Sequence, residues 1–139
     1  MRIVGLDLGS KTCGVAMCDP SEFLASPLTT LRFEENNFDE ALLMLDELAK
    51  EHQISLMALG YPKHMNNDVG ESAKRSEAFQ RALEAKGYEV VLIDERLTSK
   101  QVNDAMRFGK VKKEKRKAQV DELAATLILQ TYLDQRRSR

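Results

Sequence analysis

The sequence has no tryptophan, and aromatic side chains make up only 6% of its 139 residues. Such a composition offers no clear platform on which the bases of a single-stranded nucleic acid could stack. Only two cysteines are present, Cys13 and Cys18, and neither has a histidine nearby in the sequence. This excludes a disulfide framework of the secreted kind and makes a poor zinc site, so we expect both thiols to be small packing residues.

Long apolar runs are also absent. No segment approaches the length of a membrane span, and the N-terminus lacks the apolar region of a secretory signal. We therefore expect a cytoplasmic protein that does not act at a membrane. With 42% hydrophobic residues, the chain is long enough for one domain with a real core and too short for two. Residues 1–139 are predicted to form a single domain.

The formal net charge of −1 conceals an uneven distribution. Residues 107–139 carry 10 Lys and Arg against 4 Asp and Glu, whereas residues 1–106 carry 11 against 18. Most of the excess is in one run: Lys110, Lys112, Lys113, Lys115, Arg116 and Lys117. Such a run is usually a solvated loop, but it is also what a protein that binds phosphate backbones displays. Composition alone slightly favours the solvated loop.

Apolar periodicity predicts three strands followed by strands that alternate with helices. The strands are expected at 3–8, 13–18, 25–31, 54–59 and 89–93, and the helices at 37–51, 72–86, 98–107 and 118–135. A short connection should pair the first two strands as a hairpin, and helical crossovers should make the later strands parallel to the first. The predicted fold class is α/β, with a five-stranded mixed sheet (an antiparallel hairpin meander plus parallel strands) and helices on both faces.

Several residues mark the ends of these elements. Asn36 or Asn37 can cap the first helix, and Gly87 can close the second. Pro27 places the third strand at an edge of the sheet, because proline has no N–H to donate to a neighbouring strand.

Asp7 is unusual because it is a carboxylate inside the first apolar run, between Leu6 and Leu8. A carboxylate in a buried strand is costly unless it is paired, hydrogen-bonded or holding a cation. One interpretation is a strand-end carboxylate that caps the turn at Gly9 and Ser10. The other is a metal or phosphate site at the carboxyl edge of a sheet.

Further carboxylates are expected at that edge, because ligands of α/β proteins bind beyond the carboxyl ends of the strands. Asp94 and Glu95 follow the fifth strand, and Asp121 falls on or beside the apolar stripe of the last helix. Carboxylates gathered together repel one another, and Mg²⁺ or Mn²⁺ would resolve that repulsion. Taken singly, each has a structural explanation. Asp94 can form an ion pair with Arg96, and Asp121 can be a residue of the first helical turn, where the helix dipole favours a negative charge.

The loop after the fourth strand adds amide and cationic donors at the same edge. Lys63, His64 and Asn66 are candidate substrate contacts, although a lone exposed histidine is usually neutral to function. Asn66, Asn67 and Gly70 suit left-handed turn geometry.

Four segments carry a resemblance to a known family: residues 5–11, residues 60–62 with the loop behind them, residues 94–99 and residues 121–129. The first alone is weak, because sugar kinases and chaperone ATPases have something similar. The sequence Asp94-Glu95-Arg96-Leu97-Thr98 followed by the last helix, with its Asp…Ala-Ala pattern, is specific. Over nearly its whole length the chain resembles the YqgF-type proteins, also called RuvX, bacterial Holliday-junction resolvases and pre-16S rRNA nucleases with an RNase H-like fold.

The resemblance implies that Asp7, Glu95 and Asp121 are the catalytic residues and hold Mg²⁺ or Mn²⁺. It favours Glu95 over Asp94, which periodicity does not separate. Many relatives have Asp-Gly where this chain has Asn66-Asn67, so an acidic ligand is lost there. The nucleic-acid contacts that we expect are Lys11, Lys63, His64, Asn66, Arg96, Lys110, Lys112, Lys113, Lys115, Arg116 and Lys117.

The leading hypothesis is a divalent-metal-dependent nuclease that hydrolyses phosphodiesters in structured nucleic acid, foremost at the 5′ end of pre-16S rRNA in ribosome biogenesis. One alternative is a Holliday-junction resolvase of DNA recombination and repair, and another is a non-catalytic nucleic-acid-binding factor. A sugar kinase or actin-like ATPase would need two such domains. The expected partner is an rRNA precursor or a DNA junction, and the protein is a monomer or a homodimer.

Overall fold

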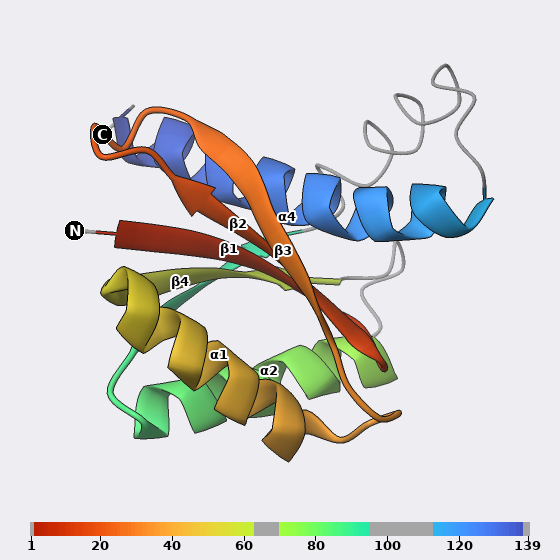
Figure 1. Cartoon of the computed structure of the whole chain (residues 1–139). Helices are drawn as coiled ribbons and strands as arrows, with labels where there is room; N and C mark the ends of the chain where they lie inside the picture. The colour runs from red at the N-terminus through yellow and green to blue at the C-terminus, as the bar shows by residue number, and fades with distance from the viewer. Residues whose placement is uncertain (1, 63–69, 95–112, 138–139) are drawn as a thin grey trace.

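The computed structural model of the chain describes residues 2–62, 70–94 and 113–137, with side chains from Glu122 onward in the last range. Its strands are β1 (Arg2–Leu8), β2 (Thr12–Cys18), β3 (Ala25–Arg32), β4 (Ile54–Tyr61) and β5 (Glu89–Asp94). Its helices are α1 (Phe38–His52), α2 (Glu71–Ala85) and α4 (Lys113–Arg137) (Figure 1). The helix predicted at 98–107 lies outside the described residues.

The strands form one mixed sheet in the order β3-β2-β1-β4-β5. β2 is antiparallel to both β1 and β3, whereas β1, β4 and β5 are parallel. The predicted fold class is thereby confirmed, and the carboxyl ends of β1, β4 and β5 meet at one edge of the sheet. The prediction for Pro27 is also confirmed, because β3 is an edge strand, and its register with β2 shifts beside this residue.

Local signals set most element ends as predicted. The side chain of Asn37 accepts a hydrogen bond from the Glu40 N–H and caps α1. Gly87 follows the end of α2 with a φ of 102°, which a residue with a Cβ rarely adopts. Gly70 departs from the prediction, because it precedes α2 in an extended conformation with a φ of −74°.

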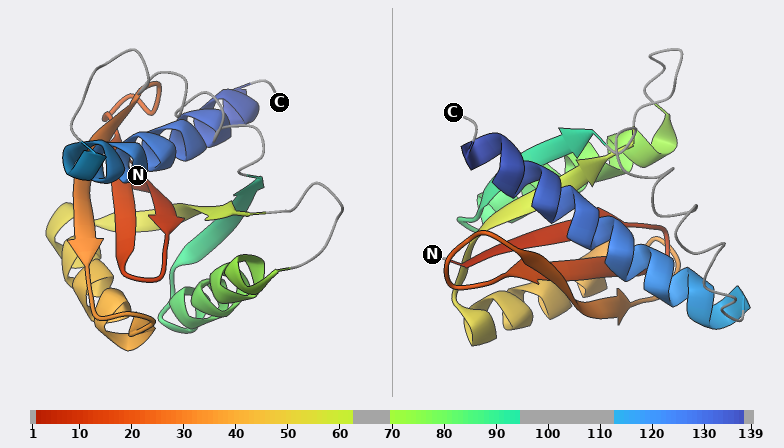
Figure 2. Two further views of the ribbon diagram at one scale, coloured as in Figure 1. Left: turned by 90° about the vertical axis from the view of Figure 1, so that its right-hand side faces the viewer. Right: turned by 90° about the horizontal axis from the view of Figure 1, so that it is seen from above.

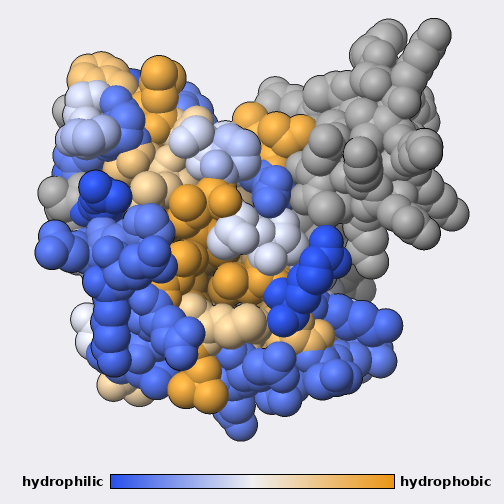
Figure 3. Space-filling model, viewed as in Figure 1, coloured by the Kyte–Doolittle hydropathy of each residue, from blue (hydrophilic) through white to orange (hydrophobic). Residues whose placement is uncertain are grey.

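Two hydrophobic cores lie on opposite faces of the sheet. α1 and α2 cover one face, where Val4, Leu6, Leu45, Phe79 and Leu83 are buried. α4 covers the other face with Ile128, Leu129 and Leu133, against Ile3 and Ala58 (Figure 2). The predicted helices on both faces are confirmed. Figure 3 shows that the outward side of α1 is largely hydrophilic, as expected for a helix that buries one face only.

The last helix begins earlier than predicted, at Lys113 instead of residue 118. Lys113, Lys115, Arg116 and Lys117 therefore lie in its first turns and not in a loop. Lysine, arginine and glutamate are good helix formers, and no glycine or proline interrupts them, so the helix continues where apolar periodicity is missing. None of the helices in the described ranges combines the length and apolar character needed to cross a membrane.

Candidate functional site

Asp7 lies one residue before the end of β1 and is half-buried. It pairs with Gly14 on β2. On the other side, Leu6 pairs with Leu59 of β4, so the next residue of β4, Gly60, is level with Asp7. The carboxylate therefore stands between two neighbouring strands that carry no side chain beside it. The position of Gly14 and Gly60 beside Asp7 could not be predicted from the sequence, because the spacing of single glycines does not reveal strand register.

The turn after Asp7 is closed by the backbone. The Gly9 N–H donates to the Thr12 carbonyl at 2.7 Å, and the Asn36 N–H donates to the Ser10 carbonyl at 2.7 Å. These two bonds fix the hairpin between β1 and β2 without using the Asp7 carboxylate. Strand alternation places Asp7 on the face that carries Ile3 and Gly5, which is the face covered by α4.

Gly5 is the point where β1 and α4 touch. A Cβ added there would lie 2.5 Å from the Ala125 carbonyl oxygen and 2.7 Å from the Leu129 Cβ. α4 runs back in roughly the direction opposite to β1, and its C-terminal end lies near the N-terminus of the chain (Figure 1). Asp7 lies about 6.6 Å beyond Gly5 along the strand, and Asp121 lies about 6 Å beyond Ala125 along the helix in the same direction. The backbone positions of Asp7 and Asp121 are thus brought to the same part of this face.

The buried residues of α4 show which side of this helix packs on the sheet, and Asp121 can be placed relative to them. The buried residues of α4 are Ala125, Ile128, Leu129 and Leu133. Leu123, Ala124 and Leu127 are only half-buried. Asp121 precedes Ala125 by four residues and Ile128 by seven, so it occupies the helix face that packs on the sheet.

The other end of α4 is tied to the turn between β2 and β3. The Ala25 N–H donates to Gln130 Oε1 at 2.9 Å, and Gln130 Nε2 donates to the Phe23 carbonyl at 2.9 Å. The Arg137 guanidinium lies 4.7 Å from the centre of the Phe23 ring. No local pattern predicts this role of Gln130, because Ala25 and Phe23 are more than 100 residues away along the chain. Together with the contact at Gly5, it sets how α4 crosses the site.

The turn itself is ordered by Asp19. Its carboxylate accepts hydrogen bonds from the Phe23 and Leu24 N–H groups and from the Ser21 hydroxyl. The Ser21 hydroxyl is the largest cause, followed by the Leu24 N–H, of a pKa for Asp19 lowered to about 2. Asp19 is thus a structural carboxylate at the edge of the sheet opposite to Asp7.

Asp94 and Glu95, at the end of β5, are the two candidates for the second carboxylate of the site. Asp94 pairs with Tyr61, whose hydroxyl donates to Glu77 Oε1 on α2 at 2.5 Å. This hydrogen bond is the main cause of a raised pKa for Tyr61. Strand alternation therefore places Asp94 on the side of α1 and α2, opposite to Asp7. Glu95 lies outside the described residues.

The predicted nucleic-acid contacts fall into three groups. Lys11 is exposed in the turn between β1 and β2, next to the end of β1. Lys113, Lys115, Arg116 and Lys117 occupy the first turns of α4, where the structure describes the helix and not its side chains. The remaining residues lie outside the described ranges: Lys63, His64, Asn66, Arg96, Lys110 and Lys112. Among the side chains that the structure describes, no three His, Cys, Asp or Glu groups gather as metal ligands, and Asp7 is the only member of the predicted trio in that set.

Comparison with known proteins identifies the family. Residues 1–135 match RuvX, described as Holliday junction resolvase. A protein of Listeria monocytogenes named "Putative pre-16S rRNA nuclease" is 42% identical over 135 residues, which cover 96% of this chain and 98% of that protein. A Bacillus subtilis protein of the same name is also 42% identical, with the same coverage of both chains.

The fold is shared with a solved resolvase. Thermus thermophilus RuvC, in a complex with a Holliday junction substrate, matches with a TM-score of 0.61 and 15% identity. The match covers 99% of this chain and 96% of RuvC, so the fold is RNase H-like throughout. On the family match and these relatives, the chain belongs to the RuvX family.

Proposed function

We propose that the chain is a divalent-metal-dependent nuclease that hydrolyses phosphodiesters of structured nucleic acid, with the 5′ end of pre-16S rRNA as its main substrate. The observation that carries this proposal is the placement of Asp7. It is a half-buried carboxylate at the carboxyl edge of parallel strands, flanked by Gly14 and Gly60. It lies on the sheet face that is covered by α4, the helix to which Asp121 belongs. The names of relatives that are 42% identical support an rRNA precursor as the substrate.

The residues at this edge suit a divalent cation. Asp7 would supply carboxylate oxygens, and the two glycines beside it leave the neighbouring strand positions without side chains. Asp121 and Glu95 would complete the ligand set, all with the oxygen donors that Mg²⁺ and Mn²⁺ prefer. Asp94 does not fit the same set, because it belongs to the opposite face of the sheet. When bound, such a cation polarises a phosphodiester and activates water.

A second candidate substrate is a four-way DNA junction. It is favoured by the description of the matched family and by the fold shared with RuvC. Both candidates use the same carboxylates, so the choice between them depends on which nucleic acid binds. The family match over residues 1–135 speaks against the sugar-kinase alternative.

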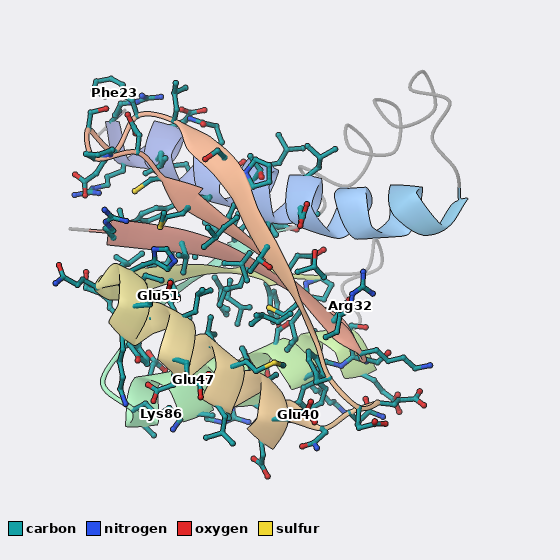
Figure 4. The ribbon with its side chains drawn as sticks, in the orientation of Figure 1. Phe23, Arg32, Glu40, Glu47, Glu51 and Lys86 are labelled. Carbon is teal, nitrogen blue, oxygen red and sulfur yellow. The ribbon has the colours of Figure 1, made fainter. Side chains whose placement is uncertain are left out.

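The test is cleavage by purified wild type and by Asp7→Asn, with Mg²⁺ or Mn²⁺, on a pre-16S rRNA fragment and on a four-way junction. We expect Asp7→Asn to lose metal-dependent cleavage of the preferred substrate while it keeps its circular dichroism spectrum. Glu47→Gln is a matched control that also converts a carboxylate to an amide, on α1 and away from the end of β1 (Figure 4). Full cleavage by Asp7→Asn would reject the site, and absence of cleavage by wild type would favour a non-catalytic binding factor.

A further inference from the structure

The last residue of β3 lies on the same sheet face as Asp7. Asp7 pairs with Gly14, Gly14 pairs with Thr30, and Arg32 is two residues beyond Thr30. Directly paired residues share a face, and so do residues two apart along a strand. Arg32 therefore belongs to the face of the proposed site, although it comes from the edge strand.

The separation suits contact with the same nucleic acid. Arg32 is two strands away from Asp7 and about two residues further along, so the two Cα atoms are about 12 Å apart. Phosphates of one strand of a duplex follow each other at about 3.4 Å along the axis. Successive phosphates are further apart in space than along the axis, so an arginine at this distance meets the backbone within about three nucleotides of a phosphodiester held at Asp7.

Backbone hydrogen bonds hold Arg32 beside Lys11. Arg32 pairs with Thr12, and the next residue, Phe33, donates its N–H to the Lys11 carbonyl at 2.9 Å. The Asn36 N–H also donates to the Ser10 carbonyl. Because these bonds join the end of β3 to the turn between β1 and β2, they fix the backbone of Arg32 relative to the end of β1.

The Arg32 guanidinium differs from most of the other described arginines. Arg75 lies over the Phe38 ring, Arg136 pairs with Glu22, and Arg137 lies over the Phe23 ring. Arg32 is exposed, and its guanidinium has no hydrogen bond or ion pair to any residue that the structure describes, which leaves its five donors available to a phosphate. Arg81 on α2 is exposed in the same way, but α2 covers the opposite face of the sheet.

Positive charge thus lies on two sides of the proposed site. β1 and α4 diverge from their contact at Gly5, with the start of α4 above and the turn between β1 and β2 below (Figures 1 and 2). Lys113, Lys115, Arg116 and Lys117 belong to the upper element, and Arg32 belongs to the lower one. Figure 4 shows Arg32 at the end of β3 that is far from Phe23. Carboxylates repel a polyanion, so cations on both sides are needed to keep a phosphate backbone between them.

We propose that Arg32 binds a backbone phosphate of the nucleic acid on the side of the site opposite to the start of α4. This proposal rests on the proposed function and adds a substrate contact to it. Glu34 and Glu35 are exposed in the turn that follows β3, and their charge would turn the backbone away from that direction. The bound strand would therefore cross the α4 face from β1 toward the end of β3.

The experiment measures binding without cleavage. Affinity of the protein for a four-way DNA junction and for a pre-16S rRNA fragment is determined by fluorescence anisotropy in EDTA, between about 50 and 200 mM salt. The variants are Arg32→Ala, Arg32→Lys and the matched control Arg81→Ala. A lost phosphate contact should reduce the slope of log affinity against log salt by about one for Arg32→Ala. Arg32→Lys should restore most of the slope, and Arg81→Ala should keep the wild-type value.

A wild-type salt slope for Arg32→Ala, in protein with unchanged thermal stability, would overturn the contact and leave the nuclease proposal standing. Wild type that binds neither nucleic acid in EDTA and cleaves neither of them with Mg²⁺ or Mn²⁺ would reject both proposals. A kinetic measurement adds an independent criterion, because a contact outside the reacting phosphodiester should raise KM and leave kcat nearly unchanged. An equal fall of kcat and kcat/KM for Arg32→Ala would contradict a role in binding alone.

Discussion

Gly5→Ala tests directly whether β1 and α4 touch backbone to backbone at the proposed site. The added Cβ would lie 2.5 Å from the Ala125 carbonyl oxygen, whereas ordinary contacts begin at 3.4 Å, so strand and helix must separate by roughly 1 Å. The nearest atom belongs to the backbone and cannot rotate away. A gap of 0.5–1 Å forfeits about a quarter to a half of the dispersion energy of the atoms that face each other.

The expected loss of stability follows from this geometry. Inserting a methyl group into a packed core typically costs about 1–3 kcal/mol, and we expect the upper end because neither partner can move alone. A loss of about 3 kcal/mol should lower the urea midpoint by about 1.5 M for an m value of about 2 kcal/mol/M. The thermal midpoint should fall by about 10 °C for a chain of this size.

Urea unfolding followed by circular dichroism measures this change, and Gly9→Ala is the matched control. A Cβ at Gly9 would lie 3.4 Å from the Thr12 carbonyl oxygen, an ordinary contact, so its stability should not fall by more than about 0.5 kcal/mol. Gly5→Ala should also lose more nuclease activity than its unfolded fraction explains, because α4 carries Asp121. If Gly5→Ala unfolds within about 0.5 kcal/mol of wild type, the close approach of β1 and α4 is wrong.

Two further predictions concern the layer of α1 and α2. The Tyr88 hydroxyl donates to the Asp46 carboxylate at 2.5 Å and is the first cause of its lowered pKa, so Tyr88→Phe should raise the pKa of Asp46 toward 3.8 in an NMR titration. The folded pKa of Asp46 is below its unfolded value, so wild type should be more stable than Tyr88→Phe at neutral pH. This difference in the free energy of unfolding should shrink below about pH 4, where Asp46 becomes protonated. The pKa of Tyr88 is raised to about 12, mainly by burial. The free energy of unfolding of wild type should therefore fall as the pH rises from 10 to 12, because the unfolded chain releases the phenol proton first. An unchanged Asp46 titration would contradict the hydrogen bond. Asn37→Ala should cost about 1 kcal/mol in urea unfolding and Asn37→Ser much less, because only the alanine removes the cap of α1; equal losses would refute this role.

Local physical chemistry accounts for most of what the sequence predicted correctly. Alternating and helical apolar spacing identified five strands and the helices of the described ranges, because each element must bury one face. Asn37 and Gly87 act on backbone groups within a few residues, so their roles follow from local sequence. The start of α4 was predicted wrongly, because charged residues with high helix propensity carry no apolar period.

The candidate site was predictable in outline from the position of Asp7. A carboxylate between Leu6 and Leu8 indicated either a turn cap or a metal or phosphate site at the carboxyl edge of β1, because a buried charge needs a partner. The role of Asp7 in a metal site stays a proposal. The resemblance to relatives added Glu95 and Asp121. Those two assignments remain proposals, supported by the face that Asp121 occupies on α4 and by the exclusion of Asp94 from it.

The sequence by itself determined which segments are strands or helices and which carboxylate is out of place, since hydrophobic period and desolvation cost are properties of the local chain. Only the tertiary structure decided which residues share a face. Strand register separated Asp94 from Asp7 and placed Arg32 with it, and the packing of α4 on Gly5 set the position of Asp121. These relations join residues far apart in the chain, and a shift of one residue in any strand would reverse them.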